Sequence, residues 1–127
     1  MTKEKRQTLT VAEAEIMNVI WTHEPIAMPD IVSQLPRTLA YSTAMTMVRI
    51  LEEKGFVVQC GKQGRAFVYQ SIVPKSEVQR SMARDLAERI FGGSVKSMVM
   101  NLIQDREIKK KDLIELKALL KEMEGEA

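Results

Sequence analysis

The hydrophobic pattern of this 127-residue chain changes its period once, after residue 55. Before that point, apolar residues recur at the three- and four-residue spacings that are typical of amphipathic helices. The segments that follow, FVVQC and AFVYQSIV, are rich in β-branched and aromatic residues, and the glycine-bearing GKQGR separates them. Two such segments around a short glycine turn predict a β-hairpin. Few folds place helices directly before a hairpin, so this order of elements restricts the possible folds of the first half of the chain.

Three helices are predicted before the hairpin. The first begins with the capping-box sequence TVAE, and the second lies within MPDIVSQLP, where a proline suits the first turn. The third spans residues 42–54, and Gly55 is placed for a left-handed C-cap. Three helices and a hairpin in this order predict a winged helix-turn-helix domain over residues 1–73.

The third predicted helix carries two kinds of surface. One face is apolar and is expected to pack on the core; it holds Ala44, Met47, Val48 and Leu51. The other face carries short polar side chains, which suit a helix that enters the major groove of DNA. Its hydroxyls can hydrogen-bond to bases or phosphates, or lay a methyl group against thymine, and its arginine can bind guanine or phosphate. With two basic residues of the hairpin, the predicted DNA-binding set is Ser42, Thr43, Met45, Thr46, Arg49, Lys62 and Arg65.

The distribution of charge agrees with this assignment. The chain has a net charge of only +2, but the positive excess is confined to its middle. Residues 37–75 hold 6 basic and 2 acidic side chains, whereas residues 1–36 hold 3 and 5, and residues 76–127 hold 10 of each. Local positive charge around a two-faced helix favours a nucleic-acid partner.

After Pro74 the composition changes to that of amphipathic helices, predicted over residues 76–91, 95–104 and 110–124. Three such helices cannot bury all their apolar faces within about 50 residues, so self-association is expected. The chain is therefore predicted to be mainly α with a small β-hairpin, a winged helix-turn-helix followed by a helical dimerisation domain over residues 74–127. The expected dimer contacts are Val78, Met82, Leu86, Ile90, Val95, Met98, Val99, Leu102, Leu113, Leu116 and Leu120.

Several classes of function have no support in the sequence. Cys60 and His23 are the only residues of their kinds, so a disulfide within the chain and a zinc or copper site are not expected. Cys60 is expected to pack within a strand and His23 to lie in a loop. No nucleotide-binding or hydrolase motif is present, which predicts no enzyme activity and no cofactor. The N-terminal residues lack a hydrophobic segment behind their charges, so no signal peptide and a cytoplasmic location are expected.

Four segments together resemble the penicillinase repressor family of the BlaI/MecI type: LTVAEAEIMNVIW, LAYSTAMTMVRILEEKGFV, GRAFVYQSIV and FGGSVKSMVMNLI. The resemblance covers nearly the whole chain. It implies a homodimer that binds a palindromic operator in double-stranded DNA through its winged helices and represses antibiotic-resistance genes. It also implies a partner, a membrane-bound sensor metallopeptidase that cuts the repressor in its dimerisation domain. Asn101-Leu102 occupies the place of the cleaved asparagine–aromatic pair.

Three positions depart from the family pattern, and alternatives stay open at two of them. Leu39 stands where a tryptophan is common. Leu102 replaces the aromatic residue, so that Asn101 is alternatively a polar-face residue of a helix and Leu102 a packing residue. Ile50 stands where much of the family carries arginine, a role that Arg49 could take over. The alternative function is a winged-helix protein-interaction module without operator binding, in which Met45 and Ile50 form an apolar docking patch.

Overall fold

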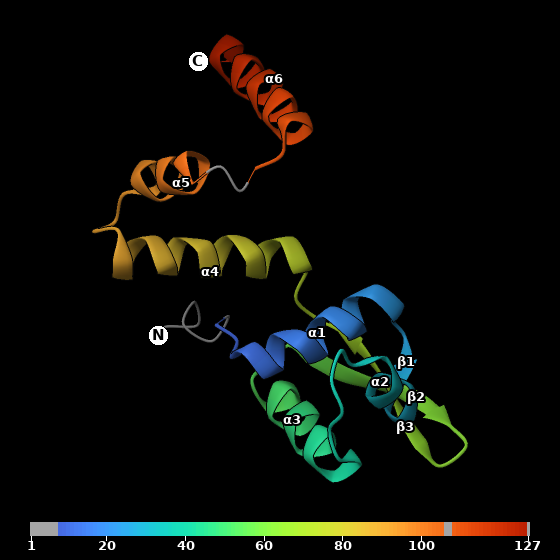
Figure 1. Ribbon diagram of the computed structural model, residues 1–127. Helices are drawn as coiled ribbons and strands as arrows, with labels where there is room; N and C mark the ends of the chain where they lie inside the picture. Colours follow the sequence, from blue (N-terminus) through green and yellow to red (C-terminus); the bar gives the residue numbers. More distant parts are fainter. Residues whose placement is uncertain (1–7, 106–107, 127) are drawn as a thin grey trace. The chain divides into compact units, whose positions relative to one another are not determined.

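The computed structural model describes residues 8–105 and 108–126. The chain divides into two compact units, Met1–Ala83 and Arg84–Ala127. The first unit contains, in chain order, α1 (Val11–His23), β1 (Ile26–Ala27), α2 (Met28–Gln34), α3 (Tyr41–Glu53), β2 (Val57–Gln63), β3 (Ala66–Ser71) and the beginning of α4 (Lys75–Ile90). The second unit contains the rest of α4, α5 (Val95–Gln104) and α6 (Lys110–Glu126) (Figure 1).

The start of α1 is fixed by the predicted capping box. The Glu13 amide donates to Thr10 Oγ1 at 3.1 Å, and the Thr10 amide donates to Glu13 Oε1 at 3.0 Å. The carboxylate also accepts hydrogen bonds from Lys54 Nζ, at 3.0 Å on Oε1 and 2.9 Å on Oε2. Because Lys54 is the C-cap of α3, this one carboxylate joins the beginning of α1 to the end of α3.

The end of α3 also follows the prediction. Gly55 has a φ of 88°, in the left-handed region that favours glycine. Its amide donates to the Glu52 carbonyl at 3.1 Å, and the Phe56 amide donates to the Leu51 carbonyl at 2.9 Å. These two bonds form a Schellman motif. Leu51 and Phe56 are both fully buried, so the motif turns the chain directly from the helix into the core.

The core of the first unit lies between α1, α2, α3 and the sheet. Its buried members come from every element of this unit; those with the largest fully buried side chains are Ile16, Met17, Ile20, Met28, Ile31, Val48, Leu51, Phe56 and Val57. Trp21 packs against this cluster, and its indole Nε1 donates to the Val73 carbonyl at 3.0 Å. Three helices packed on a hairpin confirm the predicted winged helix-turn-helix.

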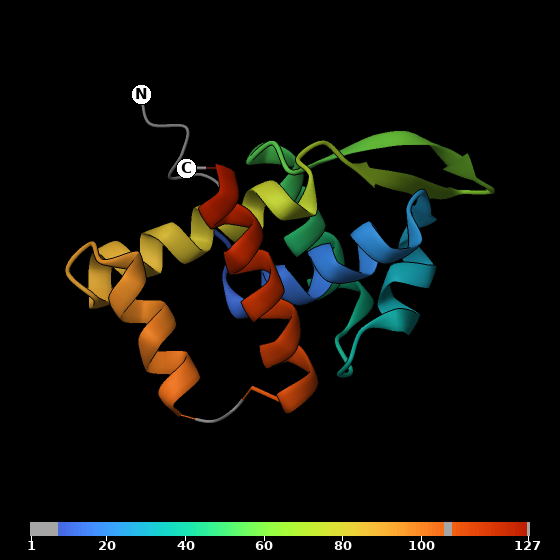
Figure 2. The same ribbon diagram turned by 90° about the horizontal axis from the view of Figure 1, so that it is seen from above.

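The sheet has one strand more than the predicted hairpin. It is antiparallel with the order β1-β3-β2, and β1 pairs through Ile26 with Tyr69 and through Ala27 with Val68. Strands β2 and β3 form the hairpin itself, which extends beyond the helices as a twisted ribbon (Figure 2). The short β1 thus ties the segment between α1 and α2 to the base of the hairpin.

The expectation that Cys60 packs within a strand is wrong. Cys60 belongs to β2 but is exposed. In the register of the hairpin, Gln59 pairs with Tyr69 and Gly61 with Val68, so Cys60 is the extra residue of a β-bulge. A bulge breaks the alternation of inward and outward side chains, and its position depends on pairing with the other strand.

In the second unit, α4 ends near Gly92 and Gly93, both with positive φ, and the Gly93 amide donates to the Ala87 carbonyl at 2.9 Å. Ser94 caps α5 by accepting a bond from the Ser97 amide at 2.9 Å. The three helices lie within a few residues of their predicted bounds, and neither α5 nor α6 has a buried residue. Within residues 8–105 and 108–126, no helix has both the length and the apolar character needed to cross a membrane.

Candidate nucleic-acid interface

The polar face of α3 is free at the surface of the first unit. Ser42, Thr43, Thr46 and Arg49 are exposed, whereas Met45 is half-buried against the core. On the apolar face, Ala44, Val48 and Leu51 are fully buried, and Met47 is half-buried against the core. The buried face packs the helix on its own domain, and the four polar side chains stay available for contact with a partner.

The N-terminal end of α3 is open. Its N-cap, Ala40, makes no side-chain hydrogen bond, and the first turn contains no acidic residue. The backbone amides and the positive end of the helix dipole therefore favour an anion such as phosphate. Tyr41 begins the helix and is 44% exposed beside these amides. Tyr41 is absent from the predicted set because the predicted helix begins one residue later.

The hydroxyl of Thr46 is used within the helix. Its Oγ1 donates to the Ser42 carbonyl one turn earlier, at 3.0 Å. Thr46 is nevertheless exposed, so its methyl group and the oxygen lone pairs contribute to the surface.

The two basic residues of the hairpin occupy different positions. Arg65 lies in the tight turn between Gln63 and Ala66, so it is at the tip. Lys62, which the sequence predicts in the GKQGR turn between the strands, belongs to β2 and pairs with Phe67. Its Nζ lies 5.1 Å from the centroid of the Phe67 ring, a cation–π distance. The strand is longer than predicted, which moves Lys62 away from the turn.

Tyr69 lies where the sheet meets α3. It is buried, and it pairs with Gln59 across the hairpin. Burial raises the pKa of the Tyr69 phenol, and the negative charge of Glu52 on α3 raises it further. The Tyr69 phenol is therefore favoured in its neutral form.

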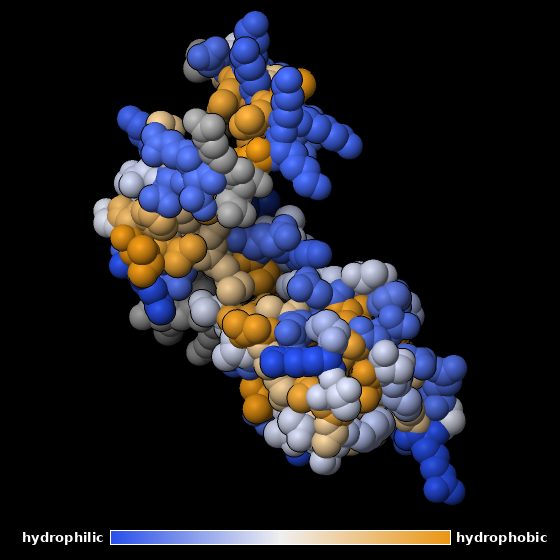
Figure 3. Space-filling view, in the orientation of Figure 1, coloured by the Kyte–Doolittle hydropathy of each residue, from blue (hydrophilic) through white to orange (hydrophobic). Residues whose placement is uncertain are grey.

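The side chains expected in a dimer contact fall into three groups by their exposure. Val78 is only 2% exposed and lies in the core of the first unit, so it is covered within one chain and has no surface for a partner. Met82 is half-buried against the same core, and Met98 is half-buried on α5. The others are exposed, and Figure 3 shows hydrophobic side chains at the surface of α5 and α6. The exposed members are Leu86, Ile90, Val95, Val99, Leu102, Leu113, Leu116 and Leu120.

The candidate cleavage site lies inside α5. Asn101 is exposed on the helix, and its carbonyl accepts a hydrogen bond from the Asp105 amide at 3.2 Å. Leu102 is 54% exposed, so one chain alone does not bury it as a core residue.

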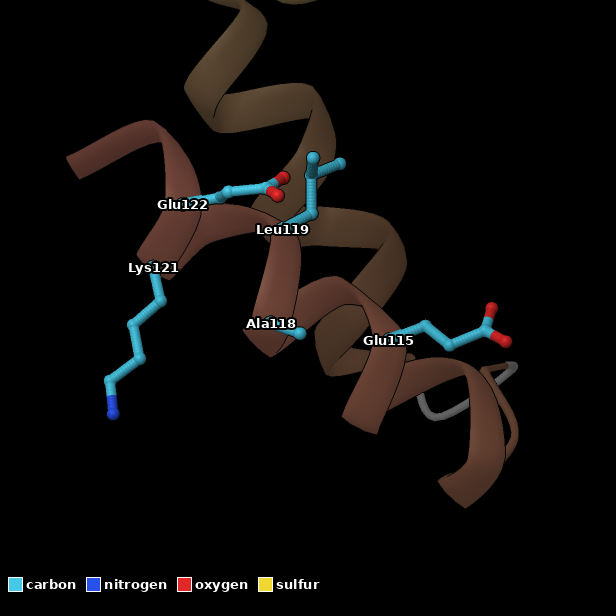
Figure 4. A pocket seen from close by; sticks show the side chains of 5 residues that line it. All are labelled: Glu115, Ala118, Leu119, Lys121 and Glu122. Carbon is cyan, nitrogen blue, oxygen red and sulfur yellow. The ribbon is translucent and has the colours of Figure 1, made fainter. Parts of the chain in front are cut away.

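A surface hollow in the second unit has the form of a helix groove and not of an enclosed site. Figure 4 shows that its lining side chains all project from α6. They are Glu115, Ala118, Leu119, Lys121 and Glu122.

Comparison with known proteins agrees with the fold and identifies a family. The profile of the penicillinase repressor family matches residues 9–122. The penicillinase repressor of Bacillus licheniformis is 31% identical over 113 residues, which cover 87% of this chain and 88% of that protein. The methicillin resistance regulatory protein MecI of Mammaliicoccus sciuri is 25% identical over 118 residues, covering 91% and 95%.

Two solved structures share parts of the architecture. The solution structure of the DNA binding domain of the repressor BlaI superposes with a TM-score of 0.50 and 33% identity over 56% of this chain and 88% of that chain. The transcriptional regulator Tm0710 from Thermotoga maritima has a TM-score of 0.53 and 21% identity over 91% and 74%, and shows the fold alone. The chain thus belongs to the penicillinase repressor family, whose members are DNA-binding transcriptional repressors and not enzymes.

Proposed function

We propose that this repressor binds a palindromic operator as a homodimer. Each copy places the exposed face of α3 in the major groove and the tip of the β2–β3 hairpin on the DNA backbone. The observation that carries the proposal is the free polar face of α3, with Arg49 exposed and the N-terminal amides open. Arg65 at the hairpin tip adds a second cationic contact.

Replacing Arg49 with alanine tests the assigned face. An arginine contact to a base is worth about 1–3 kcal/mol, so we expect operator affinity to fall by roughly 5- to 150-fold per half-site. Affinity is measured by fluorescence anisotropy on a duplex found by footprinting upstream of the repressor's own gene.

The matched control removes one positive charge elsewhere. Arg89 on α4 is exposed and forms an ion pair with Asp85 at 3.2 Å. Arg89→Ala should leave operator affinity within about twofold of the wild type, because a surface pair contributes little. Equal affinities for the Arg49→Ala variant and the wild type would refute the role of α3.

The exposed apolar faces of the second unit support the homodimer. Contiguous apolar surface on a water-soluble domain generally marks an interface. We assign the contact to the exposed leucines, valines and isoleucine of α4, α5 and α6, without Val78, which the first unit already covers.

We further propose that a sensor metallopeptidase releases the repressor by cutting at Asn101-Leu102. A cut there separates α6 from the rest of the apolar surface and so weakens the dimer. A peptide bond within a helix must unwind to enter a protease site, and α5 is exposed enough for this in the free chain. Mass spectrometry of the repressor from β-lactam-treated cells should show a fragment that ends at Asn101; an intact chain during full induction would exclude this route.

The protein-interaction alternative rests on Ile50, which is exposed, and on Met45, which is half-buried. Family membership favours the repressor. Stable capture of a protein partner together with no affinity for upstream DNA at low salt would favour the alternative.

A further inference from the structure

We infer that α3 recognises thymine by its 5-methyl group, through an apolar strip made of the Thr46 methyl and the Ile50 side chain. The inference rests on the proposed binding of α3 in the major groove. It goes further by naming the base and the chemical group that these two residues contact.

The first observation is the hydrogen bond of the Thr46 hydroxyl. A threonine hydroxyl has one proton, and in α3 that proton is donated to the Ser42 carbonyl at 3.0 Å. None remains for the acceptors in the major groove, which are guanine O6 and N7, adenine N7 and thymine O4. The groups of Thr46 that stay available are its methyl and its oxygen lone pairs.

The second observation concerns the residue one turn further along. Ile50 follows Thr46 by four residues, so the two side chains are neighbours on one face of the helix. Ile50 is 39% exposed, whereas Val48 and Leu51 hold α3 on the core and are fully buried. The Ile50 side chain can make no hydrogen bond, and it extends the Thr46 methyl into an apolar strip beside Arg49.

DNA offers one apolar partner for such a strip. The 5-methyl group of thymine is the apolar feature among the base edges of the major groove. Arg49, between the two residues in sequence, supplies the charged contact that a methyl group cannot provide. We therefore assign the strip to one or two thymines in each half-site.

Two variants separate the methyl of Thr46 from its lone pairs. Thr46→Val keeps a methyl in place and removes the oxygen, whereas Thr46→Ser keeps the hydroxyl and removes the methyl. If the lone pairs accepted a bond from an amino group of adenine or cytosine, the valine variant would lose affinity and the serine variant would not.

The experiment measures affinity for the footprinted upstream duplex and for copies in which single thymines are replaced by uracil, which lacks only the methyl. For the wild-type protein we expect affinity to fall by about fourfold for each contacted thymine that is replaced, because burial of one methyl group raises affinity by about that factor. Thr46→Val should bind within about twofold of the wild type and keep the sensitivity to uracil. Thr46→Ser should lose about fourfold on the thymine duplex and show no further loss with uracil at the same position.

Ile50→Ala extends the test to the second residue of the strip. It should abolish sensitivity to uracil at a different thymine, next to the one assigned to Thr46. Circular dichroism confirms that all variants keep their helices.

Several results would overturn the inference. Indifference of the wild type to uracil at every thymine would do so, as would loss of affinity in Thr46→Val with normal binding by Thr46→Ser. In both cases specific operator binding persists, and the proposed function stands. Absence of binding to any upstream duplex would instead overturn the proposed function and this inference together.

Discussion

The buried carboxylate of Glu13 links the beginning of α1 to the end of α3. Glu13 is 6% exposed and accepts hydrogen bonds from the Thr10 amide and from Lys54 Nζ. Burial acts to raise the pKa of Glu13, but the bonds from Thr10 and Lys54 outweigh burial, and the pKa lies below its usual 4.5. The folded state therefore favours the charged form.

Replacing Glu13 with glutamine removes the charge but keeps a side chain that can serve in the capping box. Hydrogen bonds to charged groups contribute about 1–3 kcal/mol, so we expect the free energy of unfolding to fall by that amount at pH 7. Because the folded pKa is lowered, the contribution of Glu13 is complete above the unfolded pKa and fades as the pH falls through the folded pKa. Urea unfolding should show the gap between wild type and variant narrowing toward pH 3.

Glu15 provides the matched control on the same helix. It pairs with Arg37 at 3.0 Å, and the arginine side chain is 56% exposed. Glu15→Gln should lower the free energy of unfolding at pH 7 by no more than about 1 kcal/mol. An equal loss for both variants, or a Glu13→Gln gap that does not change with pH, would contradict the role given to Glu13.

Helix α6 has most of its apolar residues on one side. Leu113, Leu116, Leu120 and Met123 follow the alternating three- and four-residue spacing of a helix-pairing seam, and all are exposed. Ile114 is equally apolar and 64% exposed, but at 3.6 residues per turn it lies on the opposite side.

Two variants of α6 test whether the dimer contact depends on the seam residues specifically or on any exposed apolar residue of the helix. The Leu116→Glu/Leu120→Glu variant should be monomeric at micromolar concentration, because charge in a buried interface is unfavourable. Ile114→Glu should remain dimeric. Sedimentation velocity measures both, and a dimer that persists in the double variant would place the contact elsewhere.

The elements that the sequence predicts are those defined by local signals. The capping box fixes α1, Gly55 ends α3, and the periodicity of α3 separates its buried from its exposed face. Strand β1 has only two residues, Ile26 and Ala27, and forms because β3 lies beside it. Its formation depends on contacts between distant segments and gives no periodic signal.

In the candidate interface, too, the features that depend on contacts between distant segments could not be predicted from the sequence. The exposed set on α3 follows from its own spacing, but the position of Lys62 depends on how far β2 and β3 pair. The burial of Val78 could not be read from α4, whose apolar residues recur every four positions along the helix. Val78 packs in the core of the first unit, whereas Leu86 and Ile90 are exposed.

At the scale of the whole molecule, the proposed repression depends on two copies that act together. One chain presents one α3 and one hairpin, which provide few contacts to DNA. Linking two such surfaces at half-sites about 34–36 Å apart makes the second contact intramolecular and raises affinity by roughly 10²- to 10⁴-fold. Cleavage or disruption of the second unit would remove this gain without changing α3.

The most direct test compares the affinity of the wild-type repressor for the complete footprinted duplex with its affinity for one half-site, at constant salt. We expect a dimer in solution that binds the complete duplex about 10²- to 10⁴-fold more tightly than the half-site. Equal affinities for the two duplexes, from a protein that sediments as a monomer at micromolar concentration, would contradict this expectation.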